Sequence, residues 1–195
     1  MSEDISSLSC DGGACGSFDW QRLIDKYYPS PSRRRDILLK HSRQVADLAL
    51  EIARNKGLGL DEKCIEAGAM LHDIGIFMTD APSIDCHGDA PYIRHGVLGA
   101  GLLRREGAPD CLVEIARRHT GAGISAEDIA ARSLPLPPGD YMPRTQLERL
   151  ICYADKFYSK SADMSRKSLE RVRASMARFS PETLTRFESL HAEFG

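Results

Sequence analysis

The most informative stretch of this chain is DEKCIEAGAMLHDIG, residues 61–75. Asp61 is a suitable N-cap for a helix whose apolar positions recur at three- and four-residue steps, and Gly75 is a suitable stop for it. The adjacent His72 and Asp73 lie at the end of this apolar helix. Because burying ionisable groups is costly unless they are paired or bound to a cation, the pair predicts a metal centre.

Helical periodicity extends from this stretch in both directions. Capping signals precede several apolar segments, and no alternating strand pattern of useful length occurs. The predicted helices cover residues 18–28, 38–57, 61–73, 92–106 and 109–119, a short segment from Ser125, residues 145–155 and a last segment from Ser180. Loops are expected at residues 77–91 and at residues 134–143, where four prolines fall within ten residues. The sequence therefore predicts an all-α fold.

The ends of the chain differ from its middle. Residues 1–17 contain three glycines and few bulky apolar side chains, so we expect a flexible N-terminal tail there. Residues 18–195 are expected to form a single domain. Its core with the metal site would span residues 38–161, and further helices would follow in residues 162–195.

Four further potential ligands surround the adjacent His-Asp pair in the sequence. Each lies on the apolar stripe of a different predicted helix: His41, His95, His119 and Asp155. A single inward histidine is more often a hydrogen-bonded core residue than a ligand, and a single inward aspartate more often pairs with arginine. Five helices that each bring such residues inward instead favour a shared metal site. Nitrogen and oxygen ligands without thiolate suit Fe, Mn, Co, Ni or Zn.

Composition limits the class of protein. The 195 residues carry a formal net charge of −2 and are 42% hydrophobic, so nothing draws the chain generally to a nucleic-acid polymer or an anionic membrane. No apolar run approaches the roughly 18 residues of a membrane span, and the acidic N-terminus lacks the features of a signal peptide. Cysteines within helical apolar patterns are expected to be reduced core residues. We therefore expect a cytoplasmic protein, and its oligomeric state is open.

The order of the potential ligands along the chain resembles that in a known protein family. Together with the segment LHDIG at residues 71–75, four of them resemble the signature of the HD superfamily of metal-dependent phosphohydrolases in its HDIG form. The four residues are His41, His72, Asp73 and Asp155, and the resemblance extends over residues 38–161. The resemblance implies an HD-domain helical bundle in which these four residues hold one metal ion. The additional His95 and His119 resemble the two-metal subset, which implies that Asp73 bridges both ions.

Shorter segments resemble particular enzymes of this superfamily. HTG at residues 119–121 and YADK at residues 153–156 are similar to segments of bacterial HD-type dinucleoside tetraphosphate hydrolases. The resemblance to the two-metal subset implies two divalent ions (Fe, Mn, Co, Ni or Zn) and a hydroxide held between them that attacks phosphorus, with Asp73 as the catalytic residue that orients it. The implied function is hydrolysis of a phosphate ester or anhydride in a small substrate, such as a nucleotide or dinucleotide.

Two other functions fit the same ligand order. The chain also resembles the HD-type mixed-valent diiron oxygenases, although no residue clearly supplies the extra substrate contacts of those enzymes. A metal-binding sensor module without catalysis is the second alternative, although its usual sign, the loss of ligands, is missing from this sequence.

Weaker candidates for substrate contacts follow from position in the sequence. Arg94, Arg118 and Lys156 each neighbour a presumed ligand and could neutralise phosphate oxygens. His87 lies in the loop at residues 77–91 and could contact substrate, and Tyr141 of the proline-rich segment could stack on a base. Each has an ordinary alternative as a solvated side chain.

Overall fold

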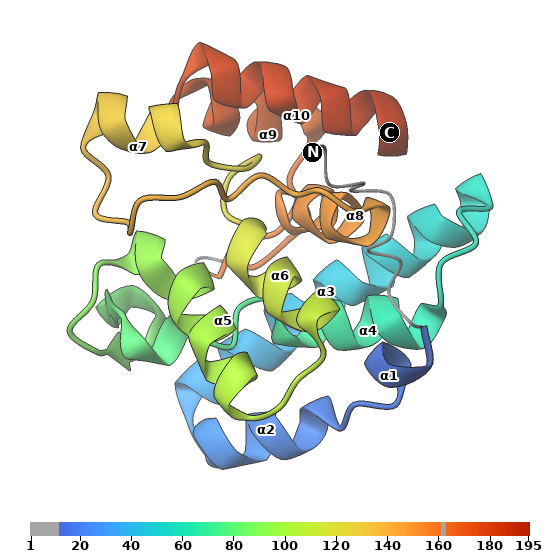
Figure 1. Cartoon of the computed structure of the whole chain (residues 1–195), viewed down its shortest axis with the longest axis vertical. Coiled ribbons are helices and arrows are strands. Elements are labelled where there is room, and N and C mark those ends of the chain that lie inside the picture. Colours follow the sequence, from blue (N-terminus) through green and yellow to red (C-terminus); the bar gives the residue numbers. More distant parts are fainter. Residues whose placement is uncertain (1–11, 161–162) are drawn as a thin grey trace, which may run out of the picture.

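Helices dominate the computed structural model, which describes residues 12–160 and 163–195 (Figure 1). The helices of this part of the chain are α1 (Gly12–Gly16), α2 (Trp20–Tyr27), α3 (Arg33–Lys56), α4 (Glu62–Leu71), α5 (His95–Arg105), α6 (Asp110–Arg118), α7 (Ala126–Arg132), α8 (Gln146–Asp155), α9 (Leu169–Ala177) and α10 (Pro181–Phe194). The predicted all-α fold is confirmed.

Local sequence signals determine where the helices begin and end. α3 ends where Gly57 adopts the left-handed backbone conformation (φ 60°), which a glycine does at little cost. The Asp61 side chain accepts hydrogen bonds from two backbone N–H groups at the start of α4. Ser125 forms a capping box with Asp128 ahead of α7. The helix boundaries predicted at these positions are confirmed.

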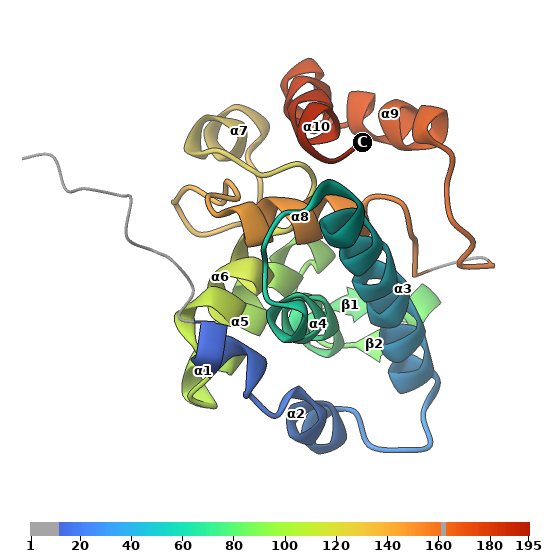
Figure 2. The ribbon, with the colours of Figure 1, turned by 90° about the vertical axis from the view of Figure 1, so that its right-hand side faces the viewer.

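Helices α3, α4, α6 and α8 surround the hydrophobic core, and α5 packs along α6 (Figures 1 and 2). Each of the four central helices contributes a side chain with no exposed surface: Leu38, Ile65, Leu112 and Leu150. A Cβ atom at Gly68 would lie 2.7 Å from side-chain carbons of both α6 and α8. The glycine therefore lets α4 pass close to its two neighbours, in the middle of the bundle.

The C-terminal helices α9 and α10 lie together over α8 (Figure 2). Tyr153 of α8 stacks on Phe187 of α10, with 5.7 Å between the ring centroids, and Phe194 contacts the same tyrosine ring. Aromatic side chains bury large apolar areas. This cluster therefore attaches the C-terminal helices to the helix that carries Asp155.

Two segments differ from the expected loop and tail. The loop at residues 77–91 contains an antiparallel pair of two-residue strands, β1 (Asp80–Ala81) and β2 (Cys86–His87), and the short 3-10 helices η2 (Ile76–Met78), η3 (Pro82–Ile84) and η4 (Tyr92–Arg94) lie beside them. Residues 12–16 form α1, so the expected tail does not extend over them. A Cβ at Gly16 would lie 2.9 Å from Lys63 Cβ, and this close approach seats α1 on α4 with Cys15 buried. Residues 1–11 lie outside the described residues.

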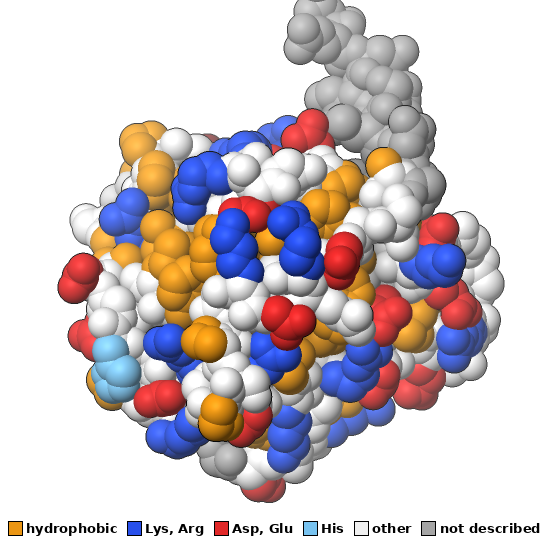
Figure 3. Space-filling view, turned by 90° about the horizontal axis from the view of Figure 1, so that it is seen from below, with side chains coloured by type: hydrophobic (Ala, Val, Ile, Leu, Met, Phe, Trp, Pro, Cys, Tyr) orange, Lys and Arg blue, Asp and Glu red, His pale blue; other side chains and the backbone are white. Residues whose placement is uncertain are grey.

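The surface adds two observations. No described helix combines the length and the apolar character that crossing a membrane requires. On the face shown in Figure 3, Lys and Arg side chains are interspersed with Asp and Glu. Charge of one sign therefore does not accumulate on this face.

Candidate metal centre

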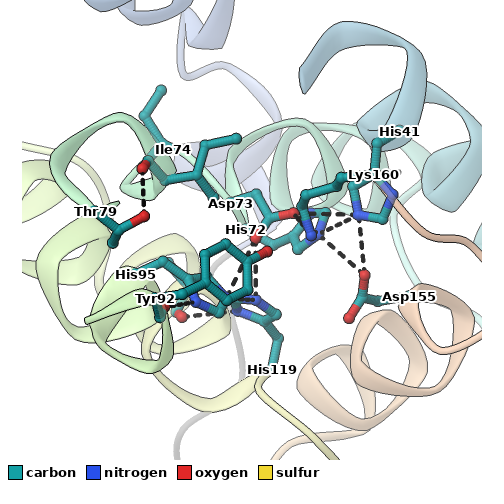
Figure 4. Close-up of polar contacts among 12 residues, drawn as sticks. His41, His72, Asp73, Ile74, Thr79, Tyr92, His95, His119, Asp155 and Lys160 are labelled. Carbon is teal, nitrogen blue, oxygen red and sulfur yellow. Dashed lines mark hydrogen bonds and ion pairs between the residues drawn. The ribbon is translucent and has the colours of Figure 1, made fainter. Parts of the chain in front are cut away.

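Six ionisable side chains converge at the centre of the helices (Figure 4). One projects from the interior of a helix and the others lie at or just beyond helix ends: His41 within α3, His72 and Asp73 after α4, His95 at the start of α5, His119 after α6 and Asp155 at the end of α8. None of the six residues as a whole is more than 8% exposed. The structure therefore brings together all six residues that the sequence predicts as ligands.

The first group of ligand atoms comes from His41, His72, Asp73 and Asp155. Nε2 of His41 lies 3.1 Å from Asp73 Oδ2 and 3.0 Å from Asp155 Oδ1. Nε2 of His72 lies 3.0 and 3.5 Å from the same two oxygens. One ligand atom of each residue lies within 4.8 Å of every other, so the four atoms could hold a single cation.

Asp73 also belongs to a second group, with His95 and His119. Its other oxygen, Oδ1, lies 3.4 Å from Nε2 of each of these histidines. The two Nε2 atoms are 2.9 Å apart. Asp73 thus directs one carboxylate oxygen to each group, which is the arrangement of a bridging ligand.

Backbone hydrogen bonds determine which ring nitrogen faces the centre. Nδ1 of His72, His95 and His119 lies 2.6, 2.6 and 2.9 Å from the carbonyl oxygen three residues earlier, so each Nδ1–H donates there. In the neutral rings of His95 and His119, Nε2 then carries a lone pair, and the two lone pairs face each other. Neither atom can donate to the other, and a cation between them satisfies both. These residues therefore fit divalent metal ions.

Asp73 is completely buried, and neither of its oxygens has a hydrogen bond of good geometry. The ammonium group of Lys160 lies 2.5 Å from Asp73 Oδ2 (Figure 4). Burial by itself raises the pKa of Asp73, but the charges of His72 and Lys160 outweigh it and hold this pKa well below its usual range. Burial likewise lowers the pKa of Lys160, yet Asp73 holds it above its usual range. Lys160 therefore compensates the buried carboxylate in the metal-free protein.

The two groups differ in their electrostatics. Burial by itself lowers the pKa of His72, but Asp73 and Asp155 outweigh it and raise this pKa to about 9. Burial lowers the pKa of His95 to about 3, against the opposing effect of Asp73. At neutral pH the first group thus holds a proton that a metal ion would displace, whereas the second group presents neutral rings.

The turn after α4 is held in place by two contacts. A Cβ atom at Gly75 would lie 2.2 Å from the carbonyl oxygen of His95 and 2.4 Å from the backbone nitrogen of Gly99. Only glycine permits so close an approach between the two backbones. The Tyr28 hydroxyl donates to the carbonyl oxygen of Ile74 at 2.8 Å. Together these contacts place the turn beside the start of α5.

Two of the predicted substrate contacts are engaged within the protein. Arg118 is buried and pairs with Glu114 of α6 at 2.7 Å and with Glu148 of α8 at 3.0 Å. Its guanidinium thus connects two helices, and its predicted contact with substrate stays a prediction. Lys156 Nζ lies 2.6 Å from Asp155 Oδ2, the oxygen that faces away from the first group's contacts. Lys156 therefore orients a presumed ligand.

The three remaining candidates lie in different settings. Tyr141 is 4% exposed and its hydroxyl donates to the carbonyl oxygen of Pro137, and its predicted stacking on a base stays a prediction. The His87 side chain is 64% exposed and lies 3.4 Å from Asp85, outside the ligand cluster. Arg94 ends η4 next to the first residue of α5, and its Nε is buried without a hydrogen-bond partner.

Sequence reasoning did not single out Lys160 or Tyr92 for a role at the site. The ring of Tyr92 stacks on the ring of His95, with 4.7 Å between centroids. The available signals were weak, because a lysine just past a helix and a tyrosine just before one are usually solvated. Only the fold brings both side chains to the ligand cluster.

Comparison with known families agrees with this geometry. The family model described as the HD domain matches residues 38–159. The chain belongs to the HD domain family. The predicted membership of the HD superfamily, and with it the HD-domain helical bundle, is confirmed.

Several proteins are similar to this HD chain in sequence. It is 39% identical over 141 residues to the tRNA (cytidine(56)-2'-O)-methyltransferase of Thermoplasma volcanium, covering 72% of this chain and 37% of that protein. It is 40% identical over 121 residues to an uncharacterized protein of Methanocaldococcus jannaschii, covering 60% and 64% respectively. A match to ribonuclease Y of Syntrophobacter fumaroxidans is 39% identical over 95 residues and covers 48% and 16%. The chain thus spans less than two thirds of the length of these relatives.

Solved structures show a similar fold. The HD domain of phosphodiesterase PgpH from L. monocytogenes superposes with a TM-score of 0.51 and 17% identity, covering 88% of this chain and 94% of that chain. The same domain in complex with cyclic-di-AMP gives a TM-score of 0.50 and 16% identity, covering 88% and 92%. At this identity the likeness establishes the fold alone.

Proposed function

We propose that this protein is a metal-dependent phosphohydrolase that cleaves a phosphate ester or anhydride of a nucleotide or dinucleotide. The observation that carries the proposal is the Asp73 carboxylate, which directs one oxygen to each of two ligand groups. Two neighbouring groups of nitrogen and oxygen ligands suit a pair of divalent ions that act on one phosphoryl group. The residues of both groups would hold these ions, with Asp73 between them.

The names of two of the matched proteins support this chemistry. Ribonuclease Y and phosphodiesterase PgpH are named for the cleavage of phosphodiesters. One PgpH structure contains cyclic-di-AMP, which supports a nucleotide as the substrate class.

Bound divalent ions would supply a hydroxide nucleophile near neutral pH and neutralise charge on the phosphoryl oxygens. The protein's own side chains have separate tasks. Asp73 keeps the two groups together, and Lys156 holds Asp155 through its outer oxygen. Lys160 lines a cavity of about 350 Å³ together with Tyr92 and Ser83, so its ammonium group can meet a phosphoryl oxygen that enters from this side.

The two alternative functions predict different observables. A diiron oxygenase would hold mostly iron and consume oxygen in the presence of its substrate. A sensor module would bind metal without turnover of any phosphate ester. Iron content with oxygen consumption, or complete inactivity of the metal-loaded chain on a panel of mononucleotides, dinucleotides and cyclic dinucleotides, would therefore contradict the proposal.

The test begins with metal content, measured by elemental analysis of protein purified without chelators and protected from air. We expect about two equivalents per chain in the wild type, about one in His95→Ala and disturbance of both sites in Asp73→Ala. His87→Ala is the matched control, because this exposed histidine lies outside the ligand cluster and should retain both equivalents. Equal metal content in the wild type and His95→Ala would rule out the two-metal assignment.

A further inference from the structure

A cavity of about 190 Å³ opens beside His95 and Tyr92, and Tyr92 also lines the separate cavity that contains Lys160. Its walls come from segments far apart in the sequence: η4 and the start of α5, the turn at residues 120–124, α7 and the residues around the start of α10. His95 both lines this cavity and belongs to the second ligand group, so the cavity lies next to a residue of the candidate metal centre. We call it the side pocket.

The side pocket is mainly apolar, and aromatic rings form its rim. Tyr92 and Phe179 are 38% and 50% exposed, and they are the large hydrophobic side chains that stand out as exposed in residues 12–160 and 163–195. Both line this pocket, with Ile93 and Ile124 in its wall. Exposed aromatic rings gathered around a concave site favour binding of a flat ring system, because each ring can stack on a π face.

The polar groups of the side pocket are compatible with an uncharged ring. The Asp128 carboxylate accepts hydrogen bonds from Arg186 at 2.7 Å and from the backbone N–H of Ser125 at 2.8 Å, so its charge is already compensated. The Arg132 guanidinium lies 5.9 Å from the centroid of the Phe179 ring. An arginine at this position can stack on a second aromatic group that enters the pocket.

The volume of the side pocket limits its occupant. Sites that enclose a whole drug-sized ligand measure roughly 300–1,000 Å³. At about 190 Å³ the side pocket is smaller, so it fits one ring system and leaves the rest of a ligand outside. With the ligand cluster next to it, a molecule with an aromatic ring at one end and a phosphate at the other can occupy both places.

We propose that the side pocket binds the nucleobase of a nucleotide substrate whose phosphate lies at the metal centre, with Phe179 and Tyr92 as stacking residues. This proposal rests on the proposed phosphohydrolase function and adds the determinant of substrate specificity. It assigns Phe179, which lies about 24 residues beyond Asp155 in the sequence, to substrate recognition. Phe179 is half exposed on the surface and is not needed for the core.

The experiment compares two phosphodiesters that release the same p-nitrophenolate. Thymidine 5′-(p-nitrophenyl) phosphate carries a base, and methyl p-nitrophenyl phosphate does not. With the Mn²⁺-loaded full chain, Phe179→Ala should lower kcat/KM for the thymidine ester by about tenfold and leave the methyl ester within about twofold. Phe179→Trp should restore the thymidine ester to near the wild-type value. Arg178→Ala is the control, since Arg178 is the exposed neighbour that does not line the pocket.

The outcomes separate this proposal from the proposed function. An equal fall for both esters, or no change for the thymidine ester, would overturn the side-pocket assignment while hydrolysis stands. If the wild type cleaves neither ester and none of the mononucleotides, dinucleotides and cyclic dinucleotides, the proposed function fails; in either case equilibrium binding of thymidine 5′-monophosphate then tests the side-pocket assignment by itself. About tenfold weaker binding by Phe179→Ala would support it, and unchanged binding would refute it. Tighter, Phe179-dependent binding of n-octyl phosphate would show instead that the pocket takes an alkyl chain.

Discussion

Replacing Lys160 by methionine removes the ammonium group that lies 2.5 Å from Asp73 Oδ2 and keeps most of the apolar side chain. We expect this change to destabilise the metal-free protein and, at the same time, to tighten metal binding. In the metal-free protein Lys160 compensates the buried carboxylate. In the loaded protein the metal ions do so, and the nearby lysine repels them.

The magnitude follows from the geometry. Two unit charges 2.5 Å apart attract each other by about 7 kcal/mol at an effective dielectric constant of about 20. Desolvation offsets part of this attraction, and removing one partner of a buried pair costs about 3–5 kcal/mol. The Lys160 side chain is 12% exposed, so solvent screens it little. If bound metal ions remove about 2 kcal/mol of the destabilisation caused by Lys160→Met, the variant must bind metal more tightly by the same free energy, which corresponds to roughly 30-fold.

The assay combines urea unfolding of the metal-free and Mn²⁺-loaded proteins with Mn²⁺ titration against a competing chelator. Lys40→Met is the matched control, because Lys40 is exposed and adjacent to His41 in the sequence, and it changes the net charge by the same amount. Lys160→Met should also lower turnover if Lys160 meets a phosphoryl oxygen. Weaker Mn²⁺ binding by Lys160→Met, or equal destabilisation of the two forms, would refute this reasoning.

Three further predictions concern the framework of the site. Gly75→Ala should destabilise the fold by at least about 1–3 kcal/mol in thermal unfolding, because its Cβ would lie 2.2 Å from a backbone oxygen. Gly101→Ala is the control: its Cβ would meet only a flexible arginine side chain at 3.6 Å, so this change should be neutral or stabilising. Tyr28→Phe should cost about 1–3 kcal/mol in urea unfolding, since it leaves the buried Ile74 carbonyl without its donor; an unchanged midpoint would show that water replaces the hydroxyl. The metal-free protein should lose about 3 kcal/mol of stability between about pH 6.5 and 9, because the pKa of His72 is raised to about 9 in the folded state. Protonated His72 contributes its full stabilisation only below the pKa of histidine in the unfolded chain, and this stabilisation is lost as the pH rises through the folded-state pKa. Metal-loaded protein should lack this slope, and a slope equal to that of the metal-free form would contradict the displacement of a proton by metal.

Local signals in the sequence were sufficient for the central helices and for the selection of the six presumed ligands, but not for α1, which forms where a tail was expected. A cap such as Asp61 or Ser125 bonds to backbone N–H groups within three residues of itself, so its role requires no knowledge of the fold. The histidines stood out because helical periodicity shows which residues share the apolar face. The ligands' order along the chain then identified the HD family.

Tertiary structure alone decided which cations serve the site. Arg118 and Lys160 are both close to a presumed ligand in the sequence, yet Arg118 pairs with Glu148 whereas Lys160 reaches Asp73. The side pocket likewise joins η4 to the start of α10, which lie far apart along the chain. The physical reason is that a long charged side chain pairs with whichever helix packs against it. The free energy of its charge then depends on how much water remains around it in the folded protein. Neighbouring residues in the sequence determine neither the partner of such a side chain nor its exposure to water, whereas they do determine a helix cap and an apolar stripe.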